Sequence, residues 1–169
     1  MAENLTINKS HSTAEIYEQL LPQLEALIDP DIPVISNLSN IAAGLFNAFD
    51  KISWCGFYMK SGEVLYLGPF CGNVACTTIK IGKGVCGTSA ASRETIIVED
   101  VDKFPGHIAC DAGSKSEIVV PLFSGSELFG VLDLDSYEYS SFNETDKIFL
   151  EKLVSVLINK LDFVQFKLL

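Results

Sequence analysis

Apolar residues recur at helical spacing near both ends of the chain and at strand spacing between them, and this order limits the folds open to the sequence. Helical periodicity covers residues 13–28 and 33–49, with a proline at the first turn of the second segment. A third helical pattern begins at Asn143, where Ser141 and Glu144 have the spacing of a capping box. It predicts a closing helix of about six turns.

Six runs rich in aromatic and β-branched residues lie between these helices. They predict strands at 52–60, 63–68, 74–81, 95–98, 116–123 and 127–135, and a short helix at 84–93 follows the third of them. Helices at both ends with strands between them favour an α+β fold over alternating βαβ units. We expect an antiparallel sheet of about six strands, with the N- and C-terminal helices packed on one face. One domain should cover residues 1–169, with residues 1–11 as a flexible N-terminus.

The charge balance and the N-terminus narrow the classes of partner. With 22 acidic and 12 basic side chains the net charge is −10, which should repel nucleic acid and acidic membranes. The first residues resemble no secretory signal, and no run reaches the ~18 to 20 apolar residues of a membrane helix. We therefore expect a cytoplasmic protein, in which the five cysteines stay reduced and any disulfide is transient.

Three cysteines, Cys76, Cys86 and Cys110, lie next to glycines or on polar loops, where buried core cysteines are not expected. Their positions favour a thiol-based reaction. A zinc site would draw on these three with Cys71 and His107, but their spacings include no C-x-x-C pair, so we predict no metal site. His107 could instead orient Cys110 or help to ionise it, or simply be solvated.

A glycine-rich segment at residues 82–87 matches the G-x-G-x-x-G dinucleotide fingerprint and has Asp102 downstream. That fingerprint functions within a βαβ unit, whereas the strands around this segment are predicted to be antiparallel. The favoured interpretation is a glycine loop that enters a short helix, whose first amides could still hold a polar group.

Acidic and aromatic residues two or four positions apart mark one face of the predicted sheet. Asp133 and Asp135 share a strand face, and Glu117 belongs to the preceding strand. Carboxyls that lie close together raise one another's pKa and favour a shared proton, although a solvated strand face would explain the same pattern. Trp54 and Tyr58 also share a face, as ordinary core or as the wall of a pocket.

Six segments together resemble the free methionine-R-sulfoxide reductases, which are stand-alone GAF-domain enzymes. They are WCGFY at 54–58, LGPF at 67–70, VAC at 74–76, GKGVCGT at 82–88, FPGHIACD at 104–111 and SEIVVP at 116–121. The cysteine spacing is the specific part of the resemblance, which runs from about residue 12 to the closing helix. It implies a GAF-like fold, reduction of the R epimer of free methionine sulfoxide, thioredoxin as the reductant and no bound cofactor.

The resemblance also implies a role for each residue of the candidate site. The nucleophile falls on Cys110, the resolving thiol on Cys76 and the third redox thiol on Cys86, whose part as relay or reserve stays open. The remaining pocket residues fall on Trp54, Tyr58, Glu117, Asp133 and Asp135. Glu117 with one of the aspartates would protonate the sulfoxide oxygen, or the carboxylates would hold the substrate ammonium.

Three questions remain open in the sequence. Cys71 departs from the family pattern and offers a competing disulfide partner. Residues 99–115 form a polar region that is expected to be mobile, because Cys110 must approach both substrate and thiol. The alternative function is a GAF sensory module that binds a small ligand without catalysis. The sequence leaves the oligomeric state open, with a homodimer as one option.

Overall fold

The computed structural model describes residues 4–108 and 110–164. Its strands are β1 Trp54–Ser61, β2 Val64–Cys71, β3 Thr78–Lys80, β4 Ile96–Val98, β5 Ser116–Ser124 and β6 Glu127–Ser136. Its helices are α1 Thr13–Leu27, α2 Val34–Ala48, α3 Gly84–Ser92 and α4 Glu144–Lys160, and a 3₁₀ turn covers Val101–Lys103. The strands form one antiparallel sheet in the order β3-β2-β1-β6-β5-β4. The predicted α+β fold is confirmed.

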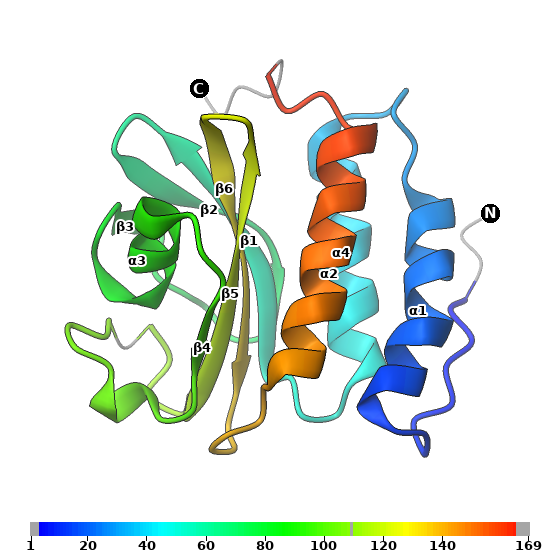
Figure 1. Ribbon diagram of the computed structural model, residues 1–169, viewed down its shortest axis with the longest axis horizontal. Coiled ribbons are helices and arrows are strands. Elements are labelled where there is room, and N and C mark those ends of the chain that lie inside the picture. Colours follow the sequence, from blue (N-terminus) through cyan, green and yellow to red (C-terminus); the bar gives the residue numbers. More distant parts are fainter. Residues whose placement is uncertain (1–3, 109, 165–169) are drawn as a thin grey trace.

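The N- and C-terminal helices cover one face of the sheet, as predicted. Helices α2 and α4 pack directly on the strands, and α1 lies over both of them (Figure 1). The larger apolar cluster fills the space between these layers and includes Leu20, Leu38, Phe57 and Leu153. Burial of these side chains supplies most of the driving force for folding.

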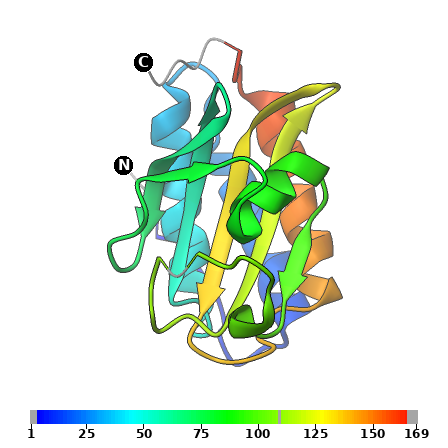
Figure 2. The same ribbon diagram turned by 90° about the vertical axis from the view of Figure 1, so that its left-hand side faces the viewer.

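The opposite face of the sheet carries α3 and the long connection that follows β4 (Figure 2). A second, smaller apolar cluster lies here and includes Trp54, Tyr58, Val85 and Val119. The two-residue period of β1 divides its side chains between the two faces, so that Phe57 packs towards the helices while its neighbour Tyr58 does not. Buried polar groups gather in this second layer and mark it as the candidate site.

Two predicted elements are shorter than the sequence pattern suggested. The strand predicted at 74–81 is reduced to β3, so Cys76 lies in a loop before it. The closing helix has 17 residues and therefore about 4.7 turns. Its chain becomes extended at Leu161, yet Leu161 and Phe163 still pack into the core, which explains why the apolar pattern continues beyond the helix.

The predicted capping box at Ser141 and Glu144 is wrong. Asn143 is the N-cap, and its side chain accepts from the backbone N–H of Thr145 at 2.8 Å. Asp146 completes the box, because its Oδ2 accepts from the backbone N–H of Asn143 at 3.0 Å. The hydroxyl of Ser141 donates instead to the carbonyl of Glu138 at 3.0 Å.

Residues 4–11 lie against the helical layer. Leu5 and Ile7 pack on the helical core, and the N–H of Thr6 donates to Oε1 of Gln23 at 2.8 Å. Flexibility of the N-terminus stays a prediction. Across the described ranges, none of the helices is both long and apolar enough to span a bilayer.

Candidate active site

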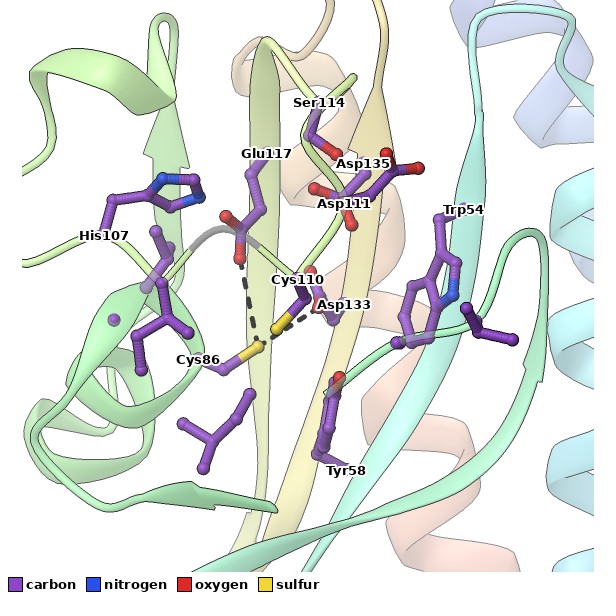
Figure 3. Close-up of a pocket in the computed structure, with 16 residues that line it drawn as sticks. Trp54, Tyr58, Cys86, His107, Cys110, Asp111, Ser114, Glu117, Asp133 and Asp135 are labelled. Carbon is purple, nitrogen blue, oxygen red and sulfur yellow. Dashed lines mark hydrogen bonds between the residues drawn. The ribbon is translucent and has the colours of Figure 1, made fainter. Parts of the chain in front are cut away.

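Strand register brings the predicted acidic and aromatic residues to one patch of the sheet. Glu117 of β5 stands opposite Asp135 of β6, and Trp54 of β1 stands opposite Asp135 on its other side. Asp133, two residues before Asp135, faces the same way (Figure 3). Gly56 stands opposite Asp133, and a Cβ there would come within 2.6 Å of the Trp54 ring. The glycine therefore leaves the space that the indole occupies.

The carboxyls of Glu117 and Asp133 are removed from water, with exposed fractions of 6% and 5%. Burial, together with the negative charges of Asp133 and Asp135, raises the pKa of Glu117 well above its ordinary value. Burial also raises the pKa of Asp133 to about 6, although hydrogen bonds from Cys86 and Glu117 oppose the change. The environment of Glu117 therefore favours the protonated carboxyl.

Asp135 is the third member of the carboxyl group. Burial and the charge of Asp133 raise its pKa well above the ordinary range, and a hydrogen bond from Ser114 partly opposes this. Three adjacent carboxyls of this kind do not ionise together at neutral pH, because each charge penalises the next. The patch can therefore supply a proton and keep a negative charge at the same time.

Cys86 lies in the first turn of α3 and points at these carboxyls (Figure 3). Its thiol donates to Oδ2 of Asp133 at 3.2 Å and reaches Oε1 of Glu117 at 3.9 Å. Burial and both carboxylates raise the pKa of this thiol well above its ordinary value. Cys86 is therefore a protonated thiol in this state, and the thiolate is disfavoured.

Two aromatic residues form the wall next to the carboxyls. The Trp54 ring stacks on Tyr58 with 5.9 Å between centroids and on Phe70 with 5.5 Å. Its indole N–H donates to the carbonyl of Asn73 at 3.0 Å, and the Tyr58 hydroxyl donates to the carbonyl of Cys76 at 3.0 Å. These bonds fix the rings and the loop between β2 and β3 relative to each other.

A disulfide joins Cys76 to Cys110 across 34 positions of sequence. Cys76 comes from the loop before β3, and Cys110 comes from the connection between β4 and β5. Both loops close over the aromatic wall and the carboxyls. The cavity left between them measures about 30 Å³, which is room for one or two water molecules and too little for an amino acid. In the disulfide state the pocket is thus too small to admit one.

Cys71 lies on the other side of the sheet. It ends β2 directly opposite Cys55, whose buried side chain belongs to the helical core. The preceding residue, Phe70, stacks on Trp54, so the strand turns Cys71 away from the pocket. Burial raises the pKa of the Cys71 thiol as well. The sheet therefore separates Cys71 from Cys110, although the sequence offered Cys71 as a competitor of Cys76 for the bond to Cys110.

The five residues weighed for a zinc site in the sequence do not form one ligand set, although Cys86, His107 and Cys110 line the same cavity. Cys76 and Cys110 are bonded to each other, and Cys71 faces the helices. His107 lines the cavity with Cys86, and burial lowers the pKa of its imidazole, which favours the neutral ring. A neutral ring supplies no positive charge to Cys110, and its effect on the reduced thiol stays a prediction.

The glycine fingerprint at residues 82–87 has a structural explanation. Every ladder of the sheet is antiparallel, so the βαβ unit of a dinucleotide site is not formed. Gly82 and Gly84 have φ of 83° and 61°, a region that favours glycine. A Cβ on Gly87 would lie 2.4 Å from the carbonyl oxygen of Lys80. The glycines thus allow α3 to begin close to β3, and this start presents Cys86 to the pocket.

The match to known proteins covers nearly the whole chain. Residues 34–157 match the family model described as "GAF domain". The free methionine-R-sulfoxide reductases of Saccharomyces cerevisiae and Escherichia coli are 46% and 40% identical to the chain, over 94% and 90% of its length and 92% and 93% of theirs. The chain belongs to the free methionine-R-sulfoxide reductase family. The resemblance seen in the sequence is thereby confirmed.

A solved structure of this reductase family has the same fold. The free methionine-R-sulfoxide reductase of Neisseria meningitidis, described "in complex with its substrate", superposes with a TM-score of 0.89 at 42% identity. The superposition covers 93% of this chain and 94% of that one. The two structures therefore correspond over most of the length of each chain.

A polar cluster at the mouth of the candidate site was not predicted from the sequence. Asp111 accepts from the Tyr137 hydroxyl at 2.7 Å and from the Asn73 amide at 3.3 Å, both at Oδ2. Its Oδ1 accepts from the N–H of Gly113 at 2.9 Å. These bonds lower the pKa of Asp111. The only sequence signal was the place of Asp111 directly after Cys110, because Asn73 and Tyr137 belong to no recognisable motif.

Proposed function

We propose that the protein reduces the R epimer of free methionine sulfoxide to methionine and is itself oxidised to the Cys76–Cys110 disulfide. The observation that carries the proposal is this disulfide, closed over a buried carboxyl group and an aromatic wall. The names of the relatives support the substrate. The thiols supply the electrons and the carboxyls supply the proton, so the reaction needs no bound cofactor.

Protonation of the sulfoxide oxygen begins the reaction. A protonated oxygen makes the sulfur electrophilic, and Glu117 is the donor because its raised pKa favours the neutral carboxyl. Asp135, on the neighbouring strand, shares the task of keeping the proton in the site. Asp133, whose pKa of about 6 leaves it the more acidic, carries the negative charge that would hold the substrate ammonium.

Cys110 then attacks the sulfur as a thiolate. The thiolate supplies the electron pair that reduces the substrate sulfur, the S–O bond of the protonated sulfoxide breaks, and its oxygen is transferred to the Cys110 sulfur. Methionine leaves, and Cys110 is oxidised to a sulfenic acid. The Cys76 thiol displaces that oxygen as water and forms the disulfide. Thioredoxin would return both thiols by exchange, which fits the cytoplasmic location that we also propose.

Cys86 takes a different part in this scheme. Its thiol has a pKa raised by burial and by two carboxylates, whereas disulfide exchange needs a thiolate. We assign it the role of a hydrogen-bond donor that holds Asp133 in place. Cys86 could act as a reserve resolving thiol only if the neighbouring carboxyls were protonated first, because their negative charges disfavour its thiolate.

The aromatic wall would select the epimer. Trp54 and Tyr58 offer an apolar surface to the S-methyl group, while the oxygen of the sulfoxide points at the carboxyls. Exchange of methyl and oxygen in the S epimer would place the oxygen against the rings, where it finds no donor. We therefore expect discrimination of at least two orders of magnitude.

The test is turnover of the separated epimers with thioredoxin as the reductant. We expect activity on the R epimer alone, and none in Cys110→Ser. Cys71→Ser is the matched control, because Cys71 lies on the helical face, and it should keep near-normal turnover. Ligand binding without turnover in the wild type would favour a sensory module instead. Normal turnover in Cys110→Ser would refute the nucleophile.

A further inference from the structure

The Cys86 thiol and the carboxyls of Glu117 and Asp133 form a compact group whose ligand atoms all lie within 4.8 Å of one another. Within residues 4–108 and 110–164, no other set of three or more His, Cys, Asp or Glu side chains lies close enough to share an ion. We propose that this group binds one thiophilic divalent cation of the zinc class. The ligands differ from those considered in the sequence, since only Cys86 is common to both sets.

The distances between the ligand atoms fit such an ion. Bond lengths of about 2.3 Å to sulfur and about 2.0 to 2.2 Å to oxygen place sulfur and oxygen about 3.5 Å apart in a tetrahedral site. In this structure the sulfur of Cys86 lies 3.2 Å from the Asp133 oxygen and 3.9 Å from the Glu117 oxygen. The two distances bracket the tetrahedral value, so a cation would fit after small side-chain shifts.

An unpartnered oxygen points to the same site. Oδ1 of Asp133 is buried and accepts no hydrogen bond from an N–H, hydroxyl or thiol of the described residues, while Oδ2 of the same carboxyl faces Cys86 across the pocket (Figure 3). The residue is only 5% exposed, so bulk water does not solvate that oxygen. A buried acceptor without a partner is costly, and a cation held by both oxygens of the Asp133 carboxylate would satisfy it.

The chemistry of the donors selects the metal. One thiolate and two carboxylates suit zinc and cobalt, whereas magnesium prefers six oxygen ligands. Binding replaces the thiol proton by a sulfur–metal bond and releases that proton to solvent, with a second one from any protonated carboxyl. The fourth coordination position would open on the cavity that Tyr58 and Cys110 also line.

The bound cation would also inhibit catalysis. This inhibition rests on the proposed function, whereas cation binding does not. The cation would remove the proton assigned to Glu117 and block the oxygen-binding side of the pocket. Free zinc would then inhibit the protein reversibly, and a chelator would remove the zinc and restore the activity. Cation binding itself requires no turnover, so the two proposals can fail independently.

The experiment uses Co²⁺ as the probe and the oxidised protein, in which the disulfide leaves Cys86 as the thiol of the pocket. We expect one Co²⁺ per chain with a thiolate-to-cobalt absorption band, displaced by Zn²⁺ and unaffected by an equal concentration of Mg²⁺. Cys86→Ser should abolish the band and weaken binding at least tenfold. Asp133→Asn should weaken binding to a similar extent and removes no thiol.

Cys71→Ser is the matched control, since it deletes a thiol on the helical face and should keep both the band and the affinity. Far-UV circular dichroism of each variant shows that it is folded. Absence of the thiolate band in the wild type would overturn the proposal. A band that survives in Cys86→Ser, or is lost in Cys71→Ser, would also overturn it.

Discussion

The phenolic hydroxyl of Tyr137 donates a 2.7 Å hydrogen bond to Oδ2 of Asp111, the residue that directly follows Cys110. Asn73 also bonds both groups, donating to the Tyr137 oxygen at 2.9 Å and to the Asp111 carboxylate at 3.3 Å. The loop that carries Cys110 and the loop that carries Cys76 are thereby joined through side chains at the mouth of the site. The bonds keep both sulfur atoms in bonding range.

Tyr137→Phe should slow disulfide formation about fivefold, equivalent to ~1 kcal/mol for one partly exposed hydrogen bond to a carboxylate. The rate of methionine release should not change, because that step precedes the approach of Cys76. Thiol trapping with mass spectrometry after a single turnover measures both rates. Tyr139→Phe is the control, since Tyr139 is 56% exposed and lies outside the cluster. Equal effects of the two variants would argue against a role for the Asp111 bonds.

Glu117→Gln should lower kcat by two to three orders of magnitude, because the amide preserves the shape of the side chain but donates no proton. The substrate KM should change little, since the ammonium is assigned to Asp133. Steady-state kinetics on the R epimer separate these two effects. A variant that kept kcat and raised KM would show that Glu117 binds substrate rather than protonating it.

Folding stability should fall as pH rises from about 4 to 7. Folding raises the pKa of Asp133 to about 6 and also raises that of Glu117, so the folded state binds more protons than the unfolded state in this range. These carboxyls make their full contribution to the free energy of unfolding below the ordinary carboxyl pKa. That contribution is lost as the pH rises through the raised pKa values of the folded state. Over this pH range the free energy of unfolding of Asp133→Asn should fall by less than that of the wild type. The difference between the two decreases should be on the order of 1 to 3 kcal/mol. Urea unfolding at several pH values tests it, and parallel pH profiles for the two proteins would refute it.

A buried ion pair at the first turn of α4 should be important for stability. Asp146 is fully buried, and its carboxylate accepts from Lys51 at 2.7 Å and from the Tyr17 hydroxyl at 3.0 Å. Lys51→Met should cost about 3 kcal/mol, because it leaves a buried charge without its counter-ion. Lys9→Met is the control, since its partner Asp50 is exposed and such pairs contribute under about 1 kcal/mol. Denaturant midpoints that shift equally would contradict this.

The sequence predicted the parts of the fold that have a local period. Alternation along β6 placed Asp133 and Asp135 on one face, and the same period on β1 separated Trp54 from Cys55. The antiparallel sheet followed from hairpin turns between successive strands. The helix ends were less predictable, since the apolar pattern continues into the extended chain at Leu161.

The contacts between loops could not be predicted from local patterns. Tyr137 bonds residues 26 and 64 positions away, and no periodicity links segments at those separations. Closeness in sequence was misleading for Cys71, which is five positions from Cys76 but on the other face of the sheet. The pairing of Cys76 with Cys110 followed from the family resemblance, not from the physics of either loop.

The hydrogen bond from the Tyr58 hydroxyl to the carbonyl of Cys76 makes one side chain both a pocket wall and the anchor of the second thiol. Cys76 then keeps its place whether or not methionine has left. The lifetime of a sulfenic acid on Cys110, and with it the window for irreversible over-oxidation by peroxide, depends on the motion of one loop instead of two.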